Sequence, residues 1–368
     1  MQKVSRLHFI DAIRAFAIIM MLQGHFIDDL LHPIYNNDNH LALKIWRYLR
    51  GLTAPTFFTI SGLIFTYLLL KAFAKQRDNV RIKKGVLRGI VLILIGYALK
   101  MDVLSWLNGN FKTHFLEVDV LHCIGLSLLI LVGLHLLLRR FCLVYALVLL
   151  VIACACFLTE PLYRNMTFNT MPVAIANYVS KANGSVFTIL PWFGYVAFGG
   201  CIATFFFNFE YHKRFKLYAI TAFLIFGFTL LKFSSYAFST LYNITGTDLF
   251  FENARYNYLF SRLGNVLIVF GICYSIERYL KFSMITKIGQ NTLSIYVIHA
   301  IILYGSFTNL GLKQYFEKAL NPTEAFIGVL CFTVLVCFIS FYVSSNAFIY
   351  AKIEQLTTKF KRIIKQNS

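Results

Sequence analysis

Long apolar stretches follow one another along this chain, separated by short polar segments. Most stretches reach the ~20 residues that ~30 Å of hydrocarbon requires, and the fifth and seventh are short. The pattern predicts an all-α, polytopic helical membrane protein, with residues 1–368 forming a single transmembrane domain. The ten predicted spans are residues 10–30, 52–72, 85–106, 118–138, 141–158, 187–207, 216–233, 258–278, 290–309 and 325–350.

Composition and charge agree with a membrane protein. The chain has 368 residues, is 58% hydrophobic and only 14% charged, and carries a net charge of +19. Of its 35 Lys and Arg residues, 22 fall in the segments that share a side with the N-terminus. The positive-inside rule makes that side cytoplasmic, and ten spans place both termini there. Topology therefore explains the charge, and we do not expect nucleic acid as a partner.

The first predicted span carries ionisable residues along one face. Arg14 and His25 are eleven residues apart, which is three helical turns plus roughly 20°. Asp11 and Asp29 extend this polar stripe at its two ends. Each ionisable side chain costs at least ~2.5 kcal/mol within a membrane unless it faces a partner or a water-filled cavity. The stripe therefore predicts a functional site.

Depth suggests different roles for these residues. If the membrane begins near residue 9, Arg14 lies about 7 Å and His25 about 24 Å from the cytoplasmic face. Arginine suits phosphate, and histidine can act as a general base. Asp29, one turn further, could orient the imidazole, and Asp28 is the rival for that role. Alternatively, Arg14 reaches back to the interface and His25 bonds another helix without a catalytic role.

A second polar group lies in the ninth span, in the sequence GQNTLSIYVIH at residues 289–299. Asn291, Ser294 and His299 are hydrogen-bonding residues in an apolar setting. His299 should lie about 15 Å deep, roughly 9 Å short of His25. It could hold the carbonyl of a donor or an amide of a substrate, or it could bond across helices as a packing residue.

Other motifs are weaker. Ser61, in TAPTFFTISG at residues 53–62, could bond a ligand, whereas Asp119, His122 and the Pro191–Trp192 pair are more often structural. The sequence contains no Gly-rich phosphate loop, HExxH zinc motif or GxSxG elbow. The eight cysteines lie in apolar segments without a CxxC pair, so we expect no metal site.

Taken together, five segments resemble a known superfamily. RLHFIDAIRAFAIIMMLQGH (6–25), FFTISGL (57–63) and GQNTLSIYVIH (289–299) resemble the motifs of acyltransferase family 3. DVLHCIGLSLL (119–129) and PWFGYVAFGG (191–200) are more similar to the related heparan-α-glucosaminide N-acetyltransferase-like branch. One departure is Arg14-Ala15 where the family commonly has Arg-Gly; alanine is small, so we expect little consequence.

The resemblance implies an acyl-CoA donor, usually acetyl-CoA, on the cytosolic side, with no metal ion. It also implies a carbohydrate, lipid-linked glycan or other hydroxyl or amine acceptor at the opposite face. Carried onto this chain, it gives His25 as the catalytic histidine and Arg14 as a donor-binding residue. We add Asp29 and His299 to the catalytic residues. The expected donor contacts are Arg14, Arg88, Ser61, Asn291 and Tyr296.

Two other functions compete with acyl transfer. A secondary transporter could use His25, His299 and the acidic residues as a proton relay, although the sequence shows none of the paired repeats common in transporters. A scaffold protein could use the same polar residues to hold helices together. Within acyl transfer, a covalent acyl-histidine intermediate stays open. We expect an integral protein of a bacterial inner membrane.

Overall fold

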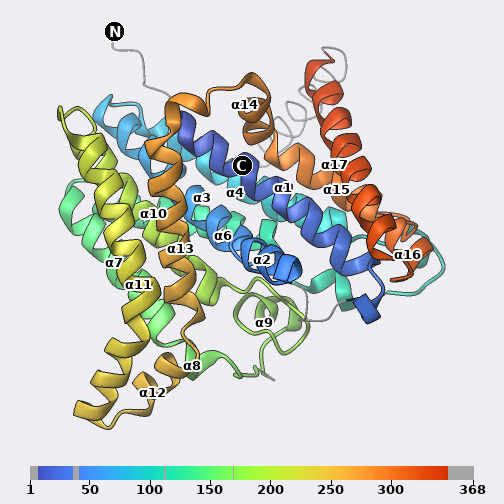
Figure 1. Cartoon of the computed structure of the whole chain (residues 1–368), viewed down its shortest axis with the longest axis horizontal. Helices are drawn as coiled ribbons and strands as arrows, with labels where there is room; N and C mark the ends of the chain where they lie inside the picture. Colours follow the sequence, from blue (N-terminus) through green and yellow to red (C-terminus); the bar gives the residue numbers. More distant parts are fainter. Residues whose placement is uncertain (1–6, 36–40, 112, 169, 347–368) are drawn as a thin grey trace.

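The computed structural model describes residues 7–35, 41–111, 113–168 and 170–346, and these ranges fold into helices without a strand (Figure 1). The all-α prediction is therefore confirmed. The helices are α1 (His8–Leu30), η1 (Pro33–Tyr35), α2 (Leu41–Arg50), α3 (Thr53–Ala74), α4 (Asp78–Lys100), α5 (Val103–Leu107), η2 (Thr113–Leu116), α6 (Val120–Leu138), α7 (Cys142–Leu158), α8 (Glu160–Tyr163), α9 (Val173–Val179), α10 (Ile189–Phe209), α11 (Phe215–Thr245), α12 (Asp248–Arg255), α13 (Tyr258–Ser275), η3 (Glu277–Tyr279), α14 (Ser283–Gln290), α15 (Thr292–Tyr304), α16 (Leu312–Phe316) and α17 (Pro322–Ser345).

Seven helical segments of the described ranges are long and apolar enough to cross a membrane. They contain α1, α2 with α3, α6, α10, α11, α13 and α17. The three other predicted spans also form helices, but α7 has 17 residues and α15 has 13. The remaining one, α4, begins with charged residues from Asp78 to Arg88. Membrane crossing is thus supported, and the count of ten is not confirmed.

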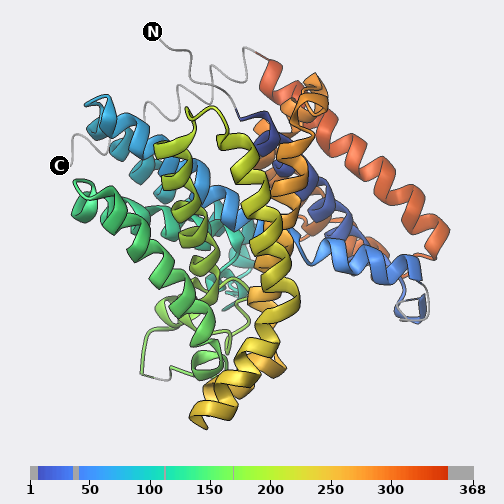
Figure 2. The ribbon, with the colours of Figure 1, turned by 60° about the vertical axis from the view of Figure 1, so that its left-hand side comes forward.

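The helix ends agree with the predicted sidedness. In Figure 2 the start of α1 and the end of α17 lie toward the same end of the bundle as the α3–α4 and α10–α11 connections. These connections contain many of the basic residues that the positive-inside rule assigns to the cytoplasm. The two termini lie outside the described residues, so their cytoplasmic location stays a prediction.

Several segments that connect the predicted spans are partly helical. Helices α2, α8, α9 and α12 lie within residues 31–51, 159–186 and 234–257. Helix α2 alternates apolar and basic residues at helical spacing and buries none of them, as an amphipathic surface helix does. Helix α11 continues past the predicted end at residue 233 because its first strong stop signal is Gly246, which ends it in a left-handed conformation.

Glycines allow the central helices to touch backbone to backbone. A Cβ atom on Gly62 of α3 would overlap the Val196 carbonyl of α10, and one on Gly199 of α10 would overlap the Thr59 carbonyl of α3. Small residues at such crossings permit the close packing that holds membrane helices together. Similar contacts occur between α4 and α6 (Gly89, Gly125), between α11 and α13 (Gly227, Gly264), and between α1 and α14 (Gly289).

The α3–α10 crossing leads to a stability prediction. Gly199→Ala should lower the melting temperature of the detergent-purified protein, because overpacking costs about 1–3 kcal/mol and carbonyl backbone cannot move aside easily. Gly133→Ala in α6 is the matched control, since a Cβ atom there meets nothing within 4 Å. Equal melting temperatures for the two variants would contradict the packing of this crossing.

Candidate functional site

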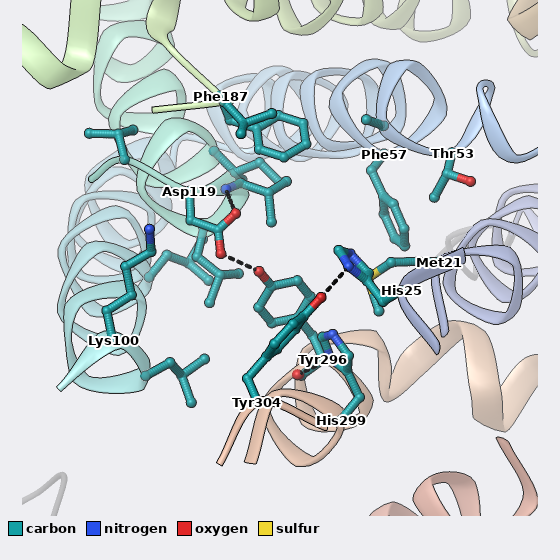
Figure 3. A pocket seen from close by; sticks show the side chains of 18 of the residues that line it. Met21, His25, Thr53, Phe57, Lys100, Asp119, Phe187, Tyr296, His299 and Tyr304 are labelled. Carbon is teal, nitrogen blue, oxygen red and sulfur yellow. Dashed lines mark hydrogen bonds between the residues drawn. The ribbon is translucent and has the colours of Figure 1, made fainter. Parts of the chain in front are cut away.

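One cavity of about 1130 Å³ lies within the helix bundle (Figure 3). Along α1 its wall runs from Arg14 to Asp29, which corresponds to ~22 Å of helix. Along α4 it runs from Arg81 to Lys100, or ~29 Å, close to the ~30 Å thickness of a hydrocarbon core. The length of the cavity along these helices is therefore comparable to the thickness of a membrane.

Arginines line the end of the cavity near the start of α1. Arg14 donates a hydrogen bond of 2.9 Å from Nη2 to Oγ1 of Thr292, the first residue of α15. Arg81 and Arg88 of α4 line the same cavity and form no ion pair with any residue that the structure describes. Nε of Arg81 is buried without a hydrogen-bond partner. In this recess, Arg81 and Arg88 thus bring positive charge that no ion pair among the described residues balances, which suits an anion.

Deeper along α1, His25 belongs to a chain of hydrogen bonds (Figure 3). The Tyr304 hydroxyl lies 2.5 Å from Nδ1 of His25 and donates to Oδ2 of Asp29 at 2.9 Å. The other carboxylate oxygen of Asp29 lies 2.8 Å from the Lys313 ammonium. Asp29 and the imidazole of His25 are therefore connected by hydrogen bonds through the Tyr304 hydroxyl.

The hydrogen-bond chain favours one tautomer of His25. Asp29 is paired with Lys313, and an ionised carboxylate only accepts hydrogen bonds. The single hydrogen of the Tyr304 hydroxyl therefore points to Asp29, and the hydroxyl oxygen accepts from Nδ1–H of His25. Nε2 is left unprotonated, and it has no hydrogen-bond partner among the described residues. This is the tautomer in which His25 can take a proton through Nε2.

His299 lies beside His25, with the two ring centroids 5.4 Å apart. The expected depth difference of about 9 Å is therefore wrong: α15 begins at Thr292 beside Arg14, within the bundle, and not at the membrane boundary. Nδ1 of His299 contacts the Tyr296 carbonyl, so it carries the proton. Nε2 is buried without a hydrogen-bond partner and can accept an N–H or O–H, but in this tautomer it cannot hold a carbonyl.

Tyr296 and Asp119 form a further pair in the cavity wall. The Tyr296 hydroxyl donates to Oδ2 of Asp119 at 2.7 Å, and the Val120 amide donates to Oδ1 at 2.7 Å. Asp119 is the N-cap of α6, so the pair ties α6 to α15. Tyr296 lines the cavity, as its predicted contact with the acyl donor requires. Its hydroxyl hydrogen, however, is already donated to Asp119.

The remaining predicted residues differ in whether they line the cavity. Ser61 lines the cavity, whereas Asn291 does not: its Nδ2 donates to the Lys287 carbonyl at 2.8 Å between α14 and α15. Asp28, the rival of Asp29, forms an ion pair of 2.5 Å with Arg50 instead of contacting His25. Tyr304 and Lys313 were not among the predicted residues, since one tyrosine among 21 near a helix end gives no distinctive signal.

The opposite end of the cavity is polar and charged. Lys100 lies 3.3 Å from Glu117, and Arg262 donates to the Gly51 carbonyl at 2.9 Å. Trp106 adds an aromatic surface there. Such a mixture of hydrogen-bonding groups and a flat ring suits a polar ligand. Within the described ranges, no group of three or more His, Cys, Asp and Glu side chains could hold a metal ion.

Comparison with known proteins identifies the family. The family model for heparan-alpha-glucosaminide N-acetyltransferase, catalytic, matches residues 6–236, which is more than half of the chain. The chain belongs to this family. The match confirms the heparan-alpha-glucosaminide N-acetyltransferase-like branch of the resemblance and supports a membrane acyltransferase; the acyltransferase family 3 assignment is not confirmed. No curated protein matches the chain.

The family match covers only part of the site. It includes α1 with Arg14, His25 and Asp29, and α4 with Arg81 and Arg88. It ends within α11, so α15 and α16 lie beyond it. The contacts that Tyr296, His299, Tyr304 and Lys313 make are therefore features of this structure that the heparan-alpha-glucosaminide N-acetyltransferase match does not include.

The tie between α15 and α6 can be tested through stability. Tyr296→Phe should lower the free energy of unfolding by about 1–2 kcal/mol, because Asp119 loses a donor in a partly buried setting. Thermal unfolding of purified protein, followed by intrinsic fluorescence, measures this loss. Tyr315→Phe is the control, since Tyr315 is 72% exposed on α16. A Tyr296→Phe variant as stable as this control would show that the pair contributes nothing.

Proposed function

We propose that the protein is an acyl-CoA-dependent membrane O- or N-acyltransferase. It moves an acyl group, in the first place acetyl, from a cytosolic donor to a hydroxyl or amine at the extracytoplasmic side. The observation that carries the proposal is the cavity that follows α1 from Arg14 past His25 to Asp29. The family match to a catalytic acetyltransferase domain supports the same reaction class.

The donor would enter at the arginine-lined end. The phosphates of coenzyme A are negatively charged, and they would pair with Arg81 and Arg88, which have no carboxylate partner among the described residues. Arg14 borders the same recess. The pantetheine arm would then follow α1 past Ser61 and Phe57, which line the cavity between the arginines and His25. This path brings the thioester to His25, and no metal ion is part of it.

His25 would act as the general base. Its Nε2 takes the proton from the acceptor hydroxyl or amine as the acceptor oxygen or nitrogen attacks the thioester carbonyl carbon. The C–S bond then breaks, and the leaving thiolate takes that proton from Nε2 to give free coenzyme A. The ring centroids of His25 and His299 are 5.4 Å apart. Nε2 of His299 would accept a hydrogen bond from the acceptor and help to orient it. This direct transfer needs no acyl-histidine intermediate.

The acceptor would approach from the opposite end of the cavity. The polar and aromatic lining there supports a carbohydrate, free or linked to a lipid. The family description names a glucosaminide and N-acetyl transfer, which makes the amine of glucosamine the first acceptor to test. A bacterial inner membrane is the proposed location, because it separates a cytosolic acyl-CoA pool from an external glycan.

Donor binding tests the arginine recess. In nanodiscs, Arg14→Ala, Arg81→Ala and Arg88→Ala should each weaken acetyl-CoA binding about 10-fold or more, because each removes a charge-assisted contact to phosphate. Titration calorimetry measures the affinity. Arg140→Ala is the control, since Arg140 is exposed and lies outside this cavity. Unchanged affinity in all three variants would place the donor elsewhere.

Catalysis tests His25 separately. His25→Ala should bind acetyl-CoA as the wild type does but release free coenzyme A about 10²–10⁴-fold more slowly with glucosamine as acceptor, because the general base is lost. His212→Ala, an exposed histidine between α10 and α11, is the matched control.

Two results would count against this proposal. Near-normal turnover by His25→Ala would overturn the general-base role. A wild type that binds no acyl-CoA would favour the transporter alternative, in which the histidines and acidic residues relay protons. Substrate uptake into proteoliposomes, without acyl chemistry, would then be the decisive measurement.

A further inference from the structure

Tyr304 is held in place from several directions. It is the last residue of α15, and the next residue, Gly305, ends the helix with φ +67°. A Cβ atom on Gly305 would collide with the backbone of the loop before α16, so only glycine fits this turn. The Lys313 ammonium lies 5.5 Å from the Tyr304 ring centroid, and the Gln314 side chain donates to the Tyr304 carbonyl at 3.4 Å. The turn thus fixes the ring and its hydroxyl.

The hydroxyl joins two residues that are one helical turn apart. His25 and Asp29 lie at i and i+4 of α1, and the structure shows no hydrogen bond between them. Instead each contacts the Tyr304 hydroxyl, at 2.5 Å and 2.9 Å respectively. Lys313 fixes the far oxygen of Asp29 at 2.8 Å. The carboxylate of Asp29 is therefore held in one orientation, and its hydrogen-bonded connection to His25 passes through the Tyr304 oxygen.

We propose that Tyr304 is a positioning residue that, with Asp29 and Lys313 behind it, keeps the proton of neutral His25 on Nδ1 and aims Nε2 into the cavity. The inference rests on the proposed function, because it assumes that His25 is the general base. Carboxylate-backed histidines elsewhere show why this matters: the wrong tautomer leaves the reacting nitrogen protonated and unable to accept a proton. Tyr304 inserts a hydroxyl between the carboxylate and the imidazole.

The arrangement also stabilises the charged state of the reaction. When Nε2 takes the proton of the acceptor, His25 becomes an imidazolium with a hydrogen on each nitrogen. Nδ1–H keeps its bond to the Tyr304 oxygen, whose own hydrogen still points to Asp29. The proton on Nε2 then leaves with the thiolate, and the neutral Nδ1–H tautomer is restored. Tyr304 neither gains nor loses a proton in this cycle.

The test compares Tyr304→Phe, Asp29→Asn and the double variant in nanodiscs, with acetyl-CoA as donor and glucosamine or water as acceptor. Free coenzyme A is measured over time. Tyr304→Phe should lower kcat about 10²-fold, short of a complete loss, because Nε2 is no longer fixed as the free nitrogen. The KM for acetyl-CoA should stay within about 2-fold, since Tyr304 lies away from the arginine recess. Tyr315→Phe, on exposed α16, is the matched control.

The double variant distinguishes a relay from two separate effects. If Asp29 acts through Tyr304, adding Asp29→Asn to Tyr304→Phe should lower kcat by less than about 2-fold more, because the connection is already broken. Losses that multiply would overturn the relay. So would wild-type kcat in Tyr304→Phe, or a rise in KM without a fall in kcat. If Tyr304→Phe does not fold, Asp29→Asn alone decides: a normal kcat overturns the relay, and a lower kcat with unchanged KM supports it.

His25→Ala in the same assay separates this inference from the proposed function. An inactive His25→Ala together with a fully active Tyr304→Phe would overturn the relay and leave the general base in place. An active His25→Ala would overturn the general-base role of His25, on which the relay rests, and leave acyl transfer itself in place. No release of coenzyme A by the wild type with either acceptor would count against both.

Discussion

The constraint on which this structure depends is the cost of placing ionisable groups in hydrocarbon. Each such group within a span needs a partner or an aqueous cavity. The bundle meets both needs in one place: Arg14 contacts Thr292, Asp29 pairs with Lys313, and Asp119 accepts from Tyr296, all in the wall of a single cavity. The site and the helix arrangement are therefore two results of the same requirement.

Sequence alone predicted those features that depend on one helix at a time. Apolar length indicated the helices, and the spacing of Arg14, His25 and Asp29 indicated a shared face, which the structure places along one cavity wall. Such inferences succeed because helical periodicity is fixed at 3.6 residues per turn whatever surrounds the helix. They give the direction of a side chain, but they do not name the neighbour that it meets.

The features that the sequence did not predict depend on packing between helices. Tyr304 and Lys313 reach Asp29 because the turn at Gly305 places α16 beside the end of α15, and no periodicity encodes that turn. The depth of His299 was misjudged for a related reason, since Thr292 begins α15 beside Arg14. Asn291 was predicted to contact the donor, but its side chain donates a hydrogen bond to the Lys287 carbonyl, where α14 meets α15.

The division of the site between two parts of the chain bears on how such an enzyme can be tuned. The arginine recess and His25 lie on α1 and α4, within the family match, whereas Tyr304 and Lys313 lie on α15 and α16, beyond it. In the proposed mechanism, donor capture and proton acceptance would use α1 and α4, whereas the hydroxyl that orients the base comes from α15. Under that proposal, changes in α15 and α16 would alter the alignment of His25 while the positive charge of Arg81 and Arg88 stays the same. If the proposed roles hold, turnover and donor affinity are separable properties in this fold, because a hydroxyl from one helix contacts an imidazole on another.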